Sequence, residues 1–592
     1  MLSILGNWIF MGILILMTGL GLMQGYAILM KKVNIQEENM DFSIIHVLFA
    51  GIMGTTLYAQ MFSIFHKVSL EAVIVLSGLV LCYGIWQRRY LAEFFRGRKA
   101  FYFSFDTKRY FVYAILCVVL LVFALCAAGP VKLYDTDWYH AQTIRWIEEY
   151  GCVKGVANIF YALGFNNAQH YFDALFSMEW LFGQSLRGSG GFFGLVIFLH
   201  GLFRIMRWNR HKTHVADMLA VWEIAYSIIV TAFYTEPYVD TLPNILVLFI
   251  VTEWIALLEE KKEDTASFGF YCLLAVFAIV CKTSVVMVIL LAAYAVYLLV
   301  RHKKRIQIWM YLGIGFMITV PYFITNVITS GYLVYLLTSI DIFHVNWKVN
   351  PAVLEYCVDN MVAFARKPAA PMEEVLTGKL SWIPEWFGAE SISHRILYLA
   401  IMGIVLYDLI QIGISIVRKR DLDFPMLWSR ISMYMGLVYW FFTIPQVRYC
   451  WSFLIFVVAV VPMYYWEKER LKMEMPSCSV KDMIFSKKYP FFLKGIMGIS
   501  LVILCLYSGF YSIRTVGYMK ANAEDYLIVQ ADYKQYTCDT IQKDGQTFYI
   551  MRDNGDIVCG YHNFPYLENK ENLDYLIVGE RLKDGFRLEN VE

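Results

Sequence analysis

Residues 284–305 read SVVMVILLAAYAVYLLVRHKKR, an uncharged and mostly apolar run that ends in a basic cluster. Such a run approaches the roughly 20 apolar residues with which a helix crosses the hydrocarbon core of a bilayer. Similar runs recur along the chain, which is 59% hydrophobic and 17% charged, whereas ordinary globular proteins are roughly 25% charged. The sequence therefore predicts an all-α polytopic membrane protein.

The apolar runs predict about fourteen transmembrane helices, because a backbone inside lipid must satisfy its own hydrogen bonds. The first run lacks the Lys or Arg and the cleavage site of a signal peptide, so we expect it to be retained. The spans are expected near residues 7–30, 43–65, 68–86, 111–130, 189–208, 215–235, 241–258, 268–281, 284–300, 306–328, 395–417, 424–444, 450–466 and 491–512.

Basic residues predict the orientation of these helices, since Lys and Arg gather in cytoplasmic loops. The segments 87–110, 301–305, 418–420 and 467–490 all carry such residues, and counting spans places all four on one side. We therefore expect an N-terminal unit, 1–110, with a basic cytoplasmic loop, and a transmembrane core, 111–511, with outer loops 131–188 and 330–393. The tail, 512–592, is expected outside.

The tail has the composition of a small soluble α+β domain. We expect short strands at Thr547–Met551 and Tyr575–Gly579, with turns at residues 543–545 and at Asn554-Gly555. A formal net charge of +2 and the lack of a binding motif predict no nucleic-acid partner. Four cysteines are expected outside the membrane, where disulfides are permitted and several pairings are open: Cys152, Cys357, Cys538 and Cys559.

The first outer loop contains LYDTDWYHAQTIRWIEEYG, residues 133–151. From Trp138 onward its apolar residues recur at near-helical spacing, which predicts an amphipathic helix along the membrane surface. Asp135 and Asp137 precede this helix, so each is either a helix cap or a functional acid. The nearby aromatic residues and His140 also suit a membrane interface.

Further charged residues are expected at the same membrane depth. Glu236 and Asp240 lie in YTEPYVDTLP, Lys282 in VCKTS and Arg448 in IPQVRY. Long basic side chains can simply extend to the interface, and the two acids stand beside prolines. The polar residues Asn158, Asn166, Asn167 and His170 either line a sugar site or are ordinary loop residues.

This set of residues suits transfer of a sugar from a polyprenyl phosphate to an acceptor hydroxyl. Asp135 or Asp137 would take the hydroxyl proton, while Arg448, Lys282 and His140 would bind the phosphate. The tentative substrate or metal ligands are Glu236, Asp240, Asn166 and His170. A divalent cation, Mg²⁺ or Mn²⁺, would also stabilise the leaving phosphate.

An acidic motif in a long outer loop, followed by an amphipathic helix, resembles the GT-C superfamily of membrane glycosyltransferases. Several stretches also resemble an uncharacterised bacterial family of multi-pass proteins that carry a domain of unknown function. They begin near Leu133 and comprise YDTDWYHAQTIRWIEEYGCVKGVANI, LGFNNA, PYFITNVITSGYLVY, IDIFHVNWKVN, SWIPEWF, FFTIPQVRYCW and LKDGFRLE. The chain departs from that family's pattern at Thr325, where arginine is expected, and at Gln446, where an acid is expected.

The GT-C resemblance implies an inverting enzyme with a lipid-linked sugar donor, an envelope glycan or lipid as acceptor, and Asp135 as the essential acid. It also implies the inner, or cytoplasmic, membrane of a bacterium.

A polysaccharide polymerase or ligase is a close alternative, since it too uses lipid-linked sugars. A lipid or solute transporter or flippase would instead show repeats and ionisable groups near the midplane. A third alternative is a non-catalytic scaffold. The outer loop 330–393, with Trp347, Trp382 and Trp386, either covers the site or anchors at the interface.

Overall fold

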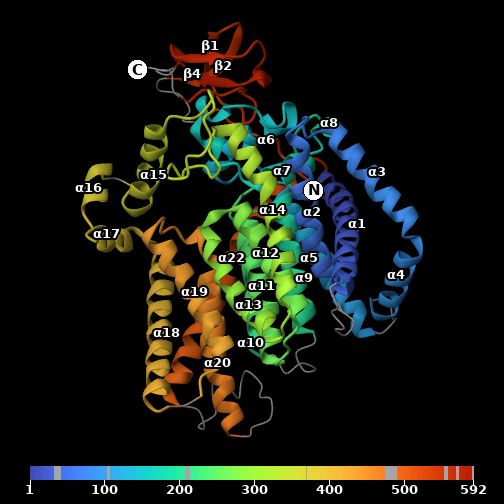
Figure 1. Ribbon diagram of the computed structural model, residues 1–592, viewed down its shortest axis with the longest axis vertical. Helices are drawn as coiled ribbons and strands as arrows, with labels where there is room; N and C mark the ends of the chain where they lie inside the picture. The colour runs from blue at the N-terminus through green and yellow to red at the C-terminus, as the bar shows by residue number, and fades with distance from the viewer. Residues whose placement is uncertain are drawn as a thin grey trace.

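The computed structural model describes residues 1–32, 42–102, 107–206, 214–368, 370–419, 421–473, 490–552, 558–568 and 573–589. At residues 97–102 and 107–112 it describes the helical backbone but not the side chains. Long helices form the body of the molecule, and a small strand region lies at one end of it (Figure 1). The strand region belongs to the C-terminal part of the chain. The predicted turn at Asn554-Gly555 lies outside the described residues.

The element bounds follow the order of the chain. The α-helices are α1 (Leu2–Lys32), α2 (Ile44–Ser63), α3 (Leu70–Trp86), α4 (Arg88–Tyr102), α5 (Thr107–Ala127), α6 (Ala141–Glu149), α7 (Ala168–Leu175), α8 (Glu179–Phe182), α9 (Ser189–Ile205), α10 (His214–Phe233), α11 (Thr241–Glu259), α12 (Thr265–Cys281), α13 (Ala292–Arg301), α14 (Arg305–Ser330), α15 (Pro351–Arg366), α16 (Met372–Thr377), α17 (Trp382–Ala389), α18 (Ile392–Val417), α19 (Phe424–Phe442), α20 (Trp451–Lys472) and α22 (Phe491–Asp525). A π-turn, η1 (Thr136–His140), precedes α6, and the 3-10 helices are η2 (Val156–Asn158), η3 (Tyr161–Phe165), η5 (Thr283–Leu291), η6 (Val447–Tyr449) and η8 (Leu582–Asp584). The strands are β1 (Cys538–Lys543), β2 (Gln546–Met551), β3 (Leu576–Val578) and β4 (Phe586–Leu588).

Within the described residues, eight helical segments are long and apolar enough to cross a membrane: α1, α2, α10, α11, η5 with α13, α14, α18 and α22. A ninth results if Leu70–Trp86 and Arg88–Arg96, bent by 80°, form one span. Helix is found in each of the fourteen predicted ranges, but fourteen spans are not confirmed. α9 and α12 have 17 residues each, and α20 ends in the charged stretch EKERLK.

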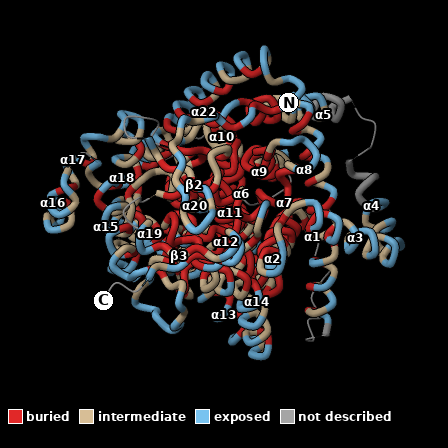
Figure 2. Tube along the Cα trace, turned by 90° about the horizontal axis from the view of Figure 1, so that it is seen from above, coloured by how far each residue is buried: buried red, intermediate tan, exposed pale blue. Residues whose placement is uncertain are grey.

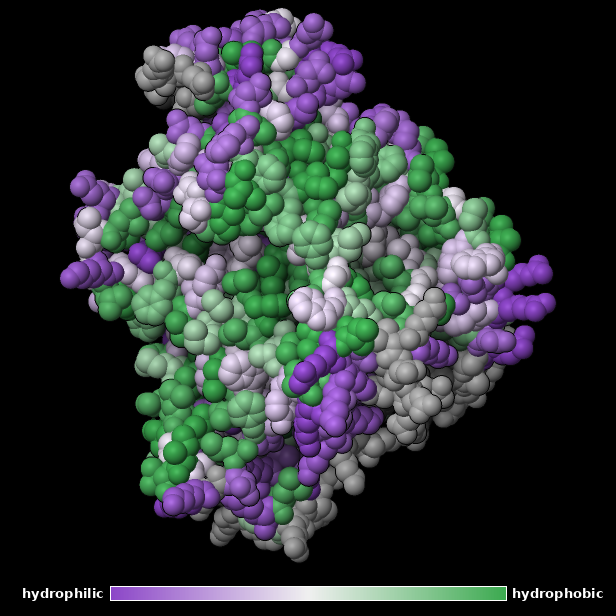
Figure 3. Space-filling view, in the orientation of Figure 1, coloured by the Kyte–Doolittle hydropathy of each residue, from purple (hydrophilic) through white to green (hydrophobic). Residues whose placement is uncertain are grey.

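The outward faces of these helices are apolar, which indicates a membrane protein. Ile9 of α1, Met317 of α14 and Met402 of α18 are each more than 60% exposed, and exposing so many large apolar side chains to water is unfavourable. Figure 3 shows hydrophobic residues across the middle of one face and hydrophilic residues over the strand region. The centre of the bundle, around α9, α10, α11 and α20, is buried (Figure 2).

Glycines allow α1 and α2 to pack closely. A Cβ on Gly19 would lie 1.9 Å from the Val47 carbonyl oxygen, and one on Gly51 would lie 1.9 Å from the Ile15 carbonyl oxygen. Small residues at such contacts are typical of helices packed within membranes. A larger side chain at either position would push the two helices apart.

A buried ion pair joins α18 to α19. Arg430 pairs with Asp408, whose two oxygens also accept hydrogen bonds from Tyr434 (2.6 Å) and Tyr465 (2.7 Å), the latter on α20. Removing one partner of a buried pair leaves an uncompensated charge, which costs about 3–5 kcal/mol.

Asp408→Asn should therefore lower the free energy of unfolding by about 3 kcal/mol or more, measured by denaturation of the detergent-solubilised protein. Asp421→Asn, at an exposed position, is the matched control. Equal stability of the two variants would show that the pair contributes little.

The C-terminal strand region contains two antiparallel hairpins. β1 pairs with β2, and the positive φ values of Asp544 and Gly545 form the predicted tight turn between them. β3 pairs with β4. Both predicted strands are thus found, although α22 continues past residue 512 to Asp525 before the strands begin.

α6 is covered on both sides instead of having a free polar face. Its apolar residues pack inward, while Gln142 donates to the Gly560 carbonyl (2.5 Å) and Arg145 donates to the Tyr561 carbonyl (2.9 Å). The C-terminal region therefore covers the polar face, which would face water in the helix along the membrane surface that the sequence predicts. Amphipathic spacing alone does not distinguish these two partners.

Glu148 of α6 makes this contact sensitive to pH. Its carboxylate accepts hydrogen bonds from Ser185 (2.8 Å) and Tyr561 (2.7 Å), and burial raises its pKa to about 7 from 4.5. Because the folded state holds this proton more tightly than the unfolded state, its contribution to stability is full below about pH 4.5. That contribution is lost as the pH rises through about 7.

The melting temperature of the unaltered protein should consequently fall more between about pH 5.5 and about pH 8 than that of Glu148→Gln does. Thermal scans of both proteins at the two pH values check this. The same loss in both would mean that Glu148 does not titrate in this range.

Candidate functional site

Arg448 lies at the centre of a polar cluster formed by three distant segments. Its Nη1 atom donates to Asp135 Oδ2 (2.7 Å) and to the Tyr238 hydroxyl (2.7 Å), and its Nη2 atom donates to the Tyr449 hydroxyl (2.9 Å). Arg448 is in η6, between α19 and α20, whereas Asp135 directly precedes η1. The fold thus brings together residues that are 313 positions apart.

A second ion pair adjoins the first. Lys282 pairs with Asp240, whose Oδ2 atom lies 3.9 Å from Arg448 Nε. The Lys282 ammonium also lies 4.3 Å from the centre of the Tyr449 ring. Two carboxylates and two cations therefore form one formally neutral group, and both cations keep partial access to solvent.

The local backbone structure leaves the Asp135 carboxylate free of a capping bond, so that it can contact Arg448. Asp135 stands at the N-cap of η1 but makes no side-chain capping bond. The Ala141 amide bonds to the Thr136 carbonyl five residues back, which is the wider π pattern often found at functional sites. The capping alternative is thus not observed for Asp135.

Asp137 points elsewhere, into the contact with the C-terminal region. Its carboxylate accepts a hydrogen bond from the Tyr536 hydroxyl (2.6 Å), and its carbonyl accepts one from the Gly560 amide (3.2 Å). Burial raises the pKa of Asp137. The structure therefore separates the two candidate acids, and only Asp135 contacts Arg448.

His140 and His170 form a buried pair beside the cluster. His140 Nδ1 and His170 Nε2 are 2.8 Å apart, so one ring donates to the other. Burial lowers the pKa of His140 well below its usual range and that of His170 to about 3. Both rings are therefore neutral near pH 7, and both are buried outside the cavity lining, so neither brings a positive charge to a phosphate.

Glu236 and Asn166 are held by the protein itself. Glu236 accepts a hydrogen bond from the Lys132 amide (3.0 Å), and burial raises its pKa. The Asn166 amide donates to Thr325 Oγ1 (2.8 Å) and its oxygen accepts from Tyr171 (2.6 Å). Thr325, where the resemblance noted in the sequence leads us to expect arginine, thus has a role in holding this loop.

The remaining candidate residues of the outer loops have mostly structural contacts. Asn158 donates to the carbonyls of Gly155 (3.1 Å) and Trp347 (2.9 Å), and so fixes the loop. Asn167 caps α7 and also lines a cavity. Trp382 and Trp386 are buried, and Trp386 donates to the Pro445 carbonyl, so neither is open to a sugar.

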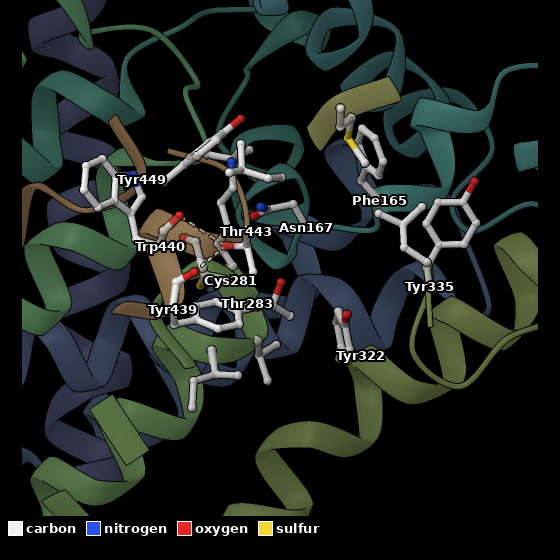
Figure 4. A pocket seen from close by; sticks show the side chains of 18 of the residues that line it. Phe165, Asn167, Cys281, Thr283, Tyr322, Tyr335, Tyr439, Trp440, Thr443 and Tyr449 are labelled. Atoms are coloured by element: carbon white, nitrogen blue, oxygen red, sulfur yellow. Dashed lines mark hydrogen bonds between the residues drawn. The ribbon is translucent and has the colours of Figure 1, made fainter. Parts of the chain in front are cut away.

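A cavity of about 210 Å³ lies next to the charged cluster. In Figure 4, Tyr439, Trp440 and Tyr449 lie on one side of it and Phe165 and Tyr335 on the other. Its remaining lining combines polar and apolar residues: Tyr139, Asn167, Val239, Ile279, Val280, Cys281, Lys282, Thr283, Ser284, Tyr322, Leu336, Met361, Thr443 and Ile444. Lys282 and Tyr449 connect the cavity to Arg448.

The acids at this site do not fit a bound divalent cation. In the described part of the chain, no group of three or more His, Cys, Asp or Glu side chains is placed to hold a metal. Asp135 and Asp240 are already paired with Arg448 and Lys282, whose positive charges would repel an adjacent metal ion.

The described residues also contain no disulfide bond, including at the four cysteines expected outside the membrane.

A comparison with protein families finds a match over most of the chain. A family described as "Domain of unknown function (DUF8201)" matches residues 1–455. The chain belongs to this family. The match includes the first four helices, which the resemblance noted in the sequence left out, and it contains every residue of the cluster around Arg448. It ends before the C-terminal strand region.

No curated protein and no solved structure matches the chain. The resemblance to an uncharacterised family of this kind is confirmed, while the relation of DUF8201 to the GT-C superfamily stays a prediction.

Two residues of the cluster, Tyr238 and Tyr449, are not among those predicted from the sequence. Tyr238 lies between the two candidate acids in YTEPYVD, and Tyr449 directly follows Arg448. Their positions beside charged residues could have identified them. Aromatic residues are so frequent in this chain, at 17%, that position alone was a weak signal.

Proposed function

We propose that the protein is an integral membrane glycosyltransferase that moves a sugar from a polyprenyl phosphate to an acceptor of the cell envelope at the extracytoplasmic face. The contact of Arg448 with Asp135, beside Lys282 and an aromatic cavity, carries this proposal. It places an acid able to take a proton next to cations able to hold a phosphate.

The charges suggest how the site would work. Arg448 is bound to Asp135. A donor phosphate would compete for Arg448 and Lys282 and would release the Asp135 carboxylate. The acceptor hydroxyl would then lose its proton to Asp135 as its oxygen attacks C1 of the sugar. The C1–O bond to phosphate breaks, its electron pair remains on the phosphate, and the configuration at C1 inverts.

The cavity suits the proposed donor in shape and chemistry. Aromatic rings such as Trp440 and Tyr335 can stack on the apolar face of a sugar. Val280, Ile279 and Ile444 supply apolar surface for the first isoprene units. Because the cluster is neutral in total, a donor with one phosphate adds less uncompensated negative charge than a diphosphate would.

The test is transfer of labelled sugar from a polyprenyl-phosphate pool in membrane vesicles that contain the protein. We expect labelled product to form and polyprenyl phosphate to be released in equal amounts. Asp135→Asn and Arg448→Ala at matched expression show whether transfer occurs at this site. Lack of donor consumption under every condition would refute the proposal.

One observation favours the transporter alternative. His200 bonds to Glu223 (2.7 Å) and lies 3.1 Å from Glu253, which in turn accepts from Arg204 (2.7 Å). This buried network joins α9, α10 and α11 far along the helices from the Asp135 site, and ionisable groups inside a membrane often mark transport pathways. Solute flux in the vesicles, without donor consumption, would support this alternative.

A further inference from the structure

A set of aromatic residues beside Asp135 has solvent access and is not part of the cavity. Tyr134, immediately before Asp135, is 53% exposed and stacks on Trp138 (6.2 Å between ring centres). Trp138 also contacts Tyr161 (6.0 Å), and both are partly exposed. These three rings form one continuous surface.

The C-terminal region adds a carboxylate to this surface. The Glu568 amide donates to the Ile159 carbonyl (3.1 Å), which fixes Glu568 next to Phe160 and Tyr161. Tyr566 packs on Phe160 (5.2 Å) and holds the same segment from behind. Burial raises the pKa of Glu568 to about 7.

Three polar groups of this surface have no hydrogen-bond partner among the residues that the structure describes. No described residue hydrogen-bonds the Glu568 carboxylate or the hydroxyls of Tyr134 and Tyr161. A partly buried carboxylate without a donor is unfavourable, so a ligand that brings hydroxyl groups would stabilise it. The pairing of aromatic faces with an acceptor oxygen suits a sugar ring, whose C–H face is apolar and whose edge carries hydroxyls.

We propose that Tyr134, Trp138, Tyr161 and Glu568 form a binding site for a sugar ring of a glycan. The ring lies on the aromatic faces, and Glu568 accepts hydrogen bonds from two of its hydroxyls. Because Tyr134 adjoins Asp135, a glycan bound here would present a further hydroxyl to that acid. Its role as the acceptor rests on the proposed function, whereas binding itself does not.

A membrane-interface role does not explain this surface equally well. Aromatic residues that anchor a protein in lipid lie on the perimeter of the transmembrane helices. Trp138 and Tyr161 instead pack against a cluster shared with the C-terminal strands, including Phe548 and Tyr566. This surface therefore lies at the end of the molecule that carries the hydrophilic strand region (Figures 1 and 3).

The test is binding of short soluble oligosaccharides of glucose, galactose, mannose and N-acetylglucosamine to the full chain in lipid nanodiscs. We expect at least one to bind, and Glu568→Gln and Tyr134→Ala each to weaken that binding about tenfold. Glu580→Gln and Tyr575→Ala, at exposed positions of the same C-terminal region, are matched controls and should leave it unchanged. Melting temperatures confirm that the variants are folded.

Two outcomes would overturn the site: no oligosaccharide binds the unaltered protein, or both variants bind as well as it does. Asp135→Asn separates this inference from the proposed function. It should retain oligosaccharide binding while losing sugar transfer. If Asp135→Asn transfers sugar normally but Glu568→Gln fails to bind, the glycan site stands and the proposed catalytic role of Asp135 fails.

Discussion

Asp135→Asn should reduce sugar transfer by about 10²–10⁴-fold, which is the range typical for loss of a general base. The amide has nearly the same shape as the carboxylate, so it can still accept the hydrogen bond from Arg448 (2.7 Å). It cannot take a proton from the acceptor hydroxyl. Because a neutral amide competes less with the donor phosphate for Arg448 than the carboxylate does, donor binding should be retained or strengthened while turnover falls.

The measurement is the rate of transfer at saturating donor together with donor affinity. Asp341→Asn is the matched control, because Asp341 is also paired with a basic residue, Lys348, but belongs to a different loop. We expect the control to keep full activity. Full activity of Asp135→Asn would refute its role as the base. A parallel loss of donor binding would instead indicate that Asp135 mainly positions Arg448.

The positions of the helices could be predicted from sequence, but the number of spans could not. Apolar runs are local and each contains helix in the structure. Whether a helix spans a membrane depends also on its length and on what covers it. α9 and α12 have 17 residues and are largely buried by other helices, so their apolar character reflects protein packing as much as lipid.

The candidate site was predictable in part for a similar reason. Asp135, Asp240, Lys282 and Arg448 are all charged residues at helix ends, and this unusual position drew attention to them. Their mutual contacts depend on tertiary structure. Asp137, two residues from Asp135 and chemically identical, faces Tyr536 instead, and sequence spacing in a π-turn does not reveal that difference.

Contacts between distant helices were the least predictable feature. Two acids of α10, Asp217 and Glu223, illustrate this. In the structure Asp217 lies 3.3 Å from Arg204, and Glu223 bonds to His200, so both belong to one network. The partners come from α9, and no pattern within α10 specifies which face of α9 it meets.

Arg448→Ala should reduce transfer by about 10²–10³-fold, the effect typical of removing a group that stabilises charge developing in the transition state. Arg448 makes three directed contacts, with Asp135, Tyr238 and Tyr449. Its loss would also leave the carboxylates of Asp135 and Asp240 near each other with only Lys282 to balance them. We therefore expect weaker donor binding as well as slower turnover.

Arg448→Lys distinguishes charge from geometry. Lysine keeps the positive charge but cannot reproduce the planar, two-point contact of the guanidinium. If Arg448 acts mainly by stabilising the negative charge of the leaving phosphate, Arg448→Lys should recover part of the activity that Arg448→Ala loses. If orientation of Asp135 matters more, both variants should be equally inactive.

Arg581→Ala, at an exposed position of the C-terminal region, is the control for loss of an arginine in general. The transfer assay with varied donor concentration checks all three variants. Normal transfer by Arg448→Ala would remove the main support for the proposed function. Loss of transfer with a normal melting temperature would support a position of the donor phosphate at Arg448, which contacts both Asp135 and Tyr449 of the cavity lining.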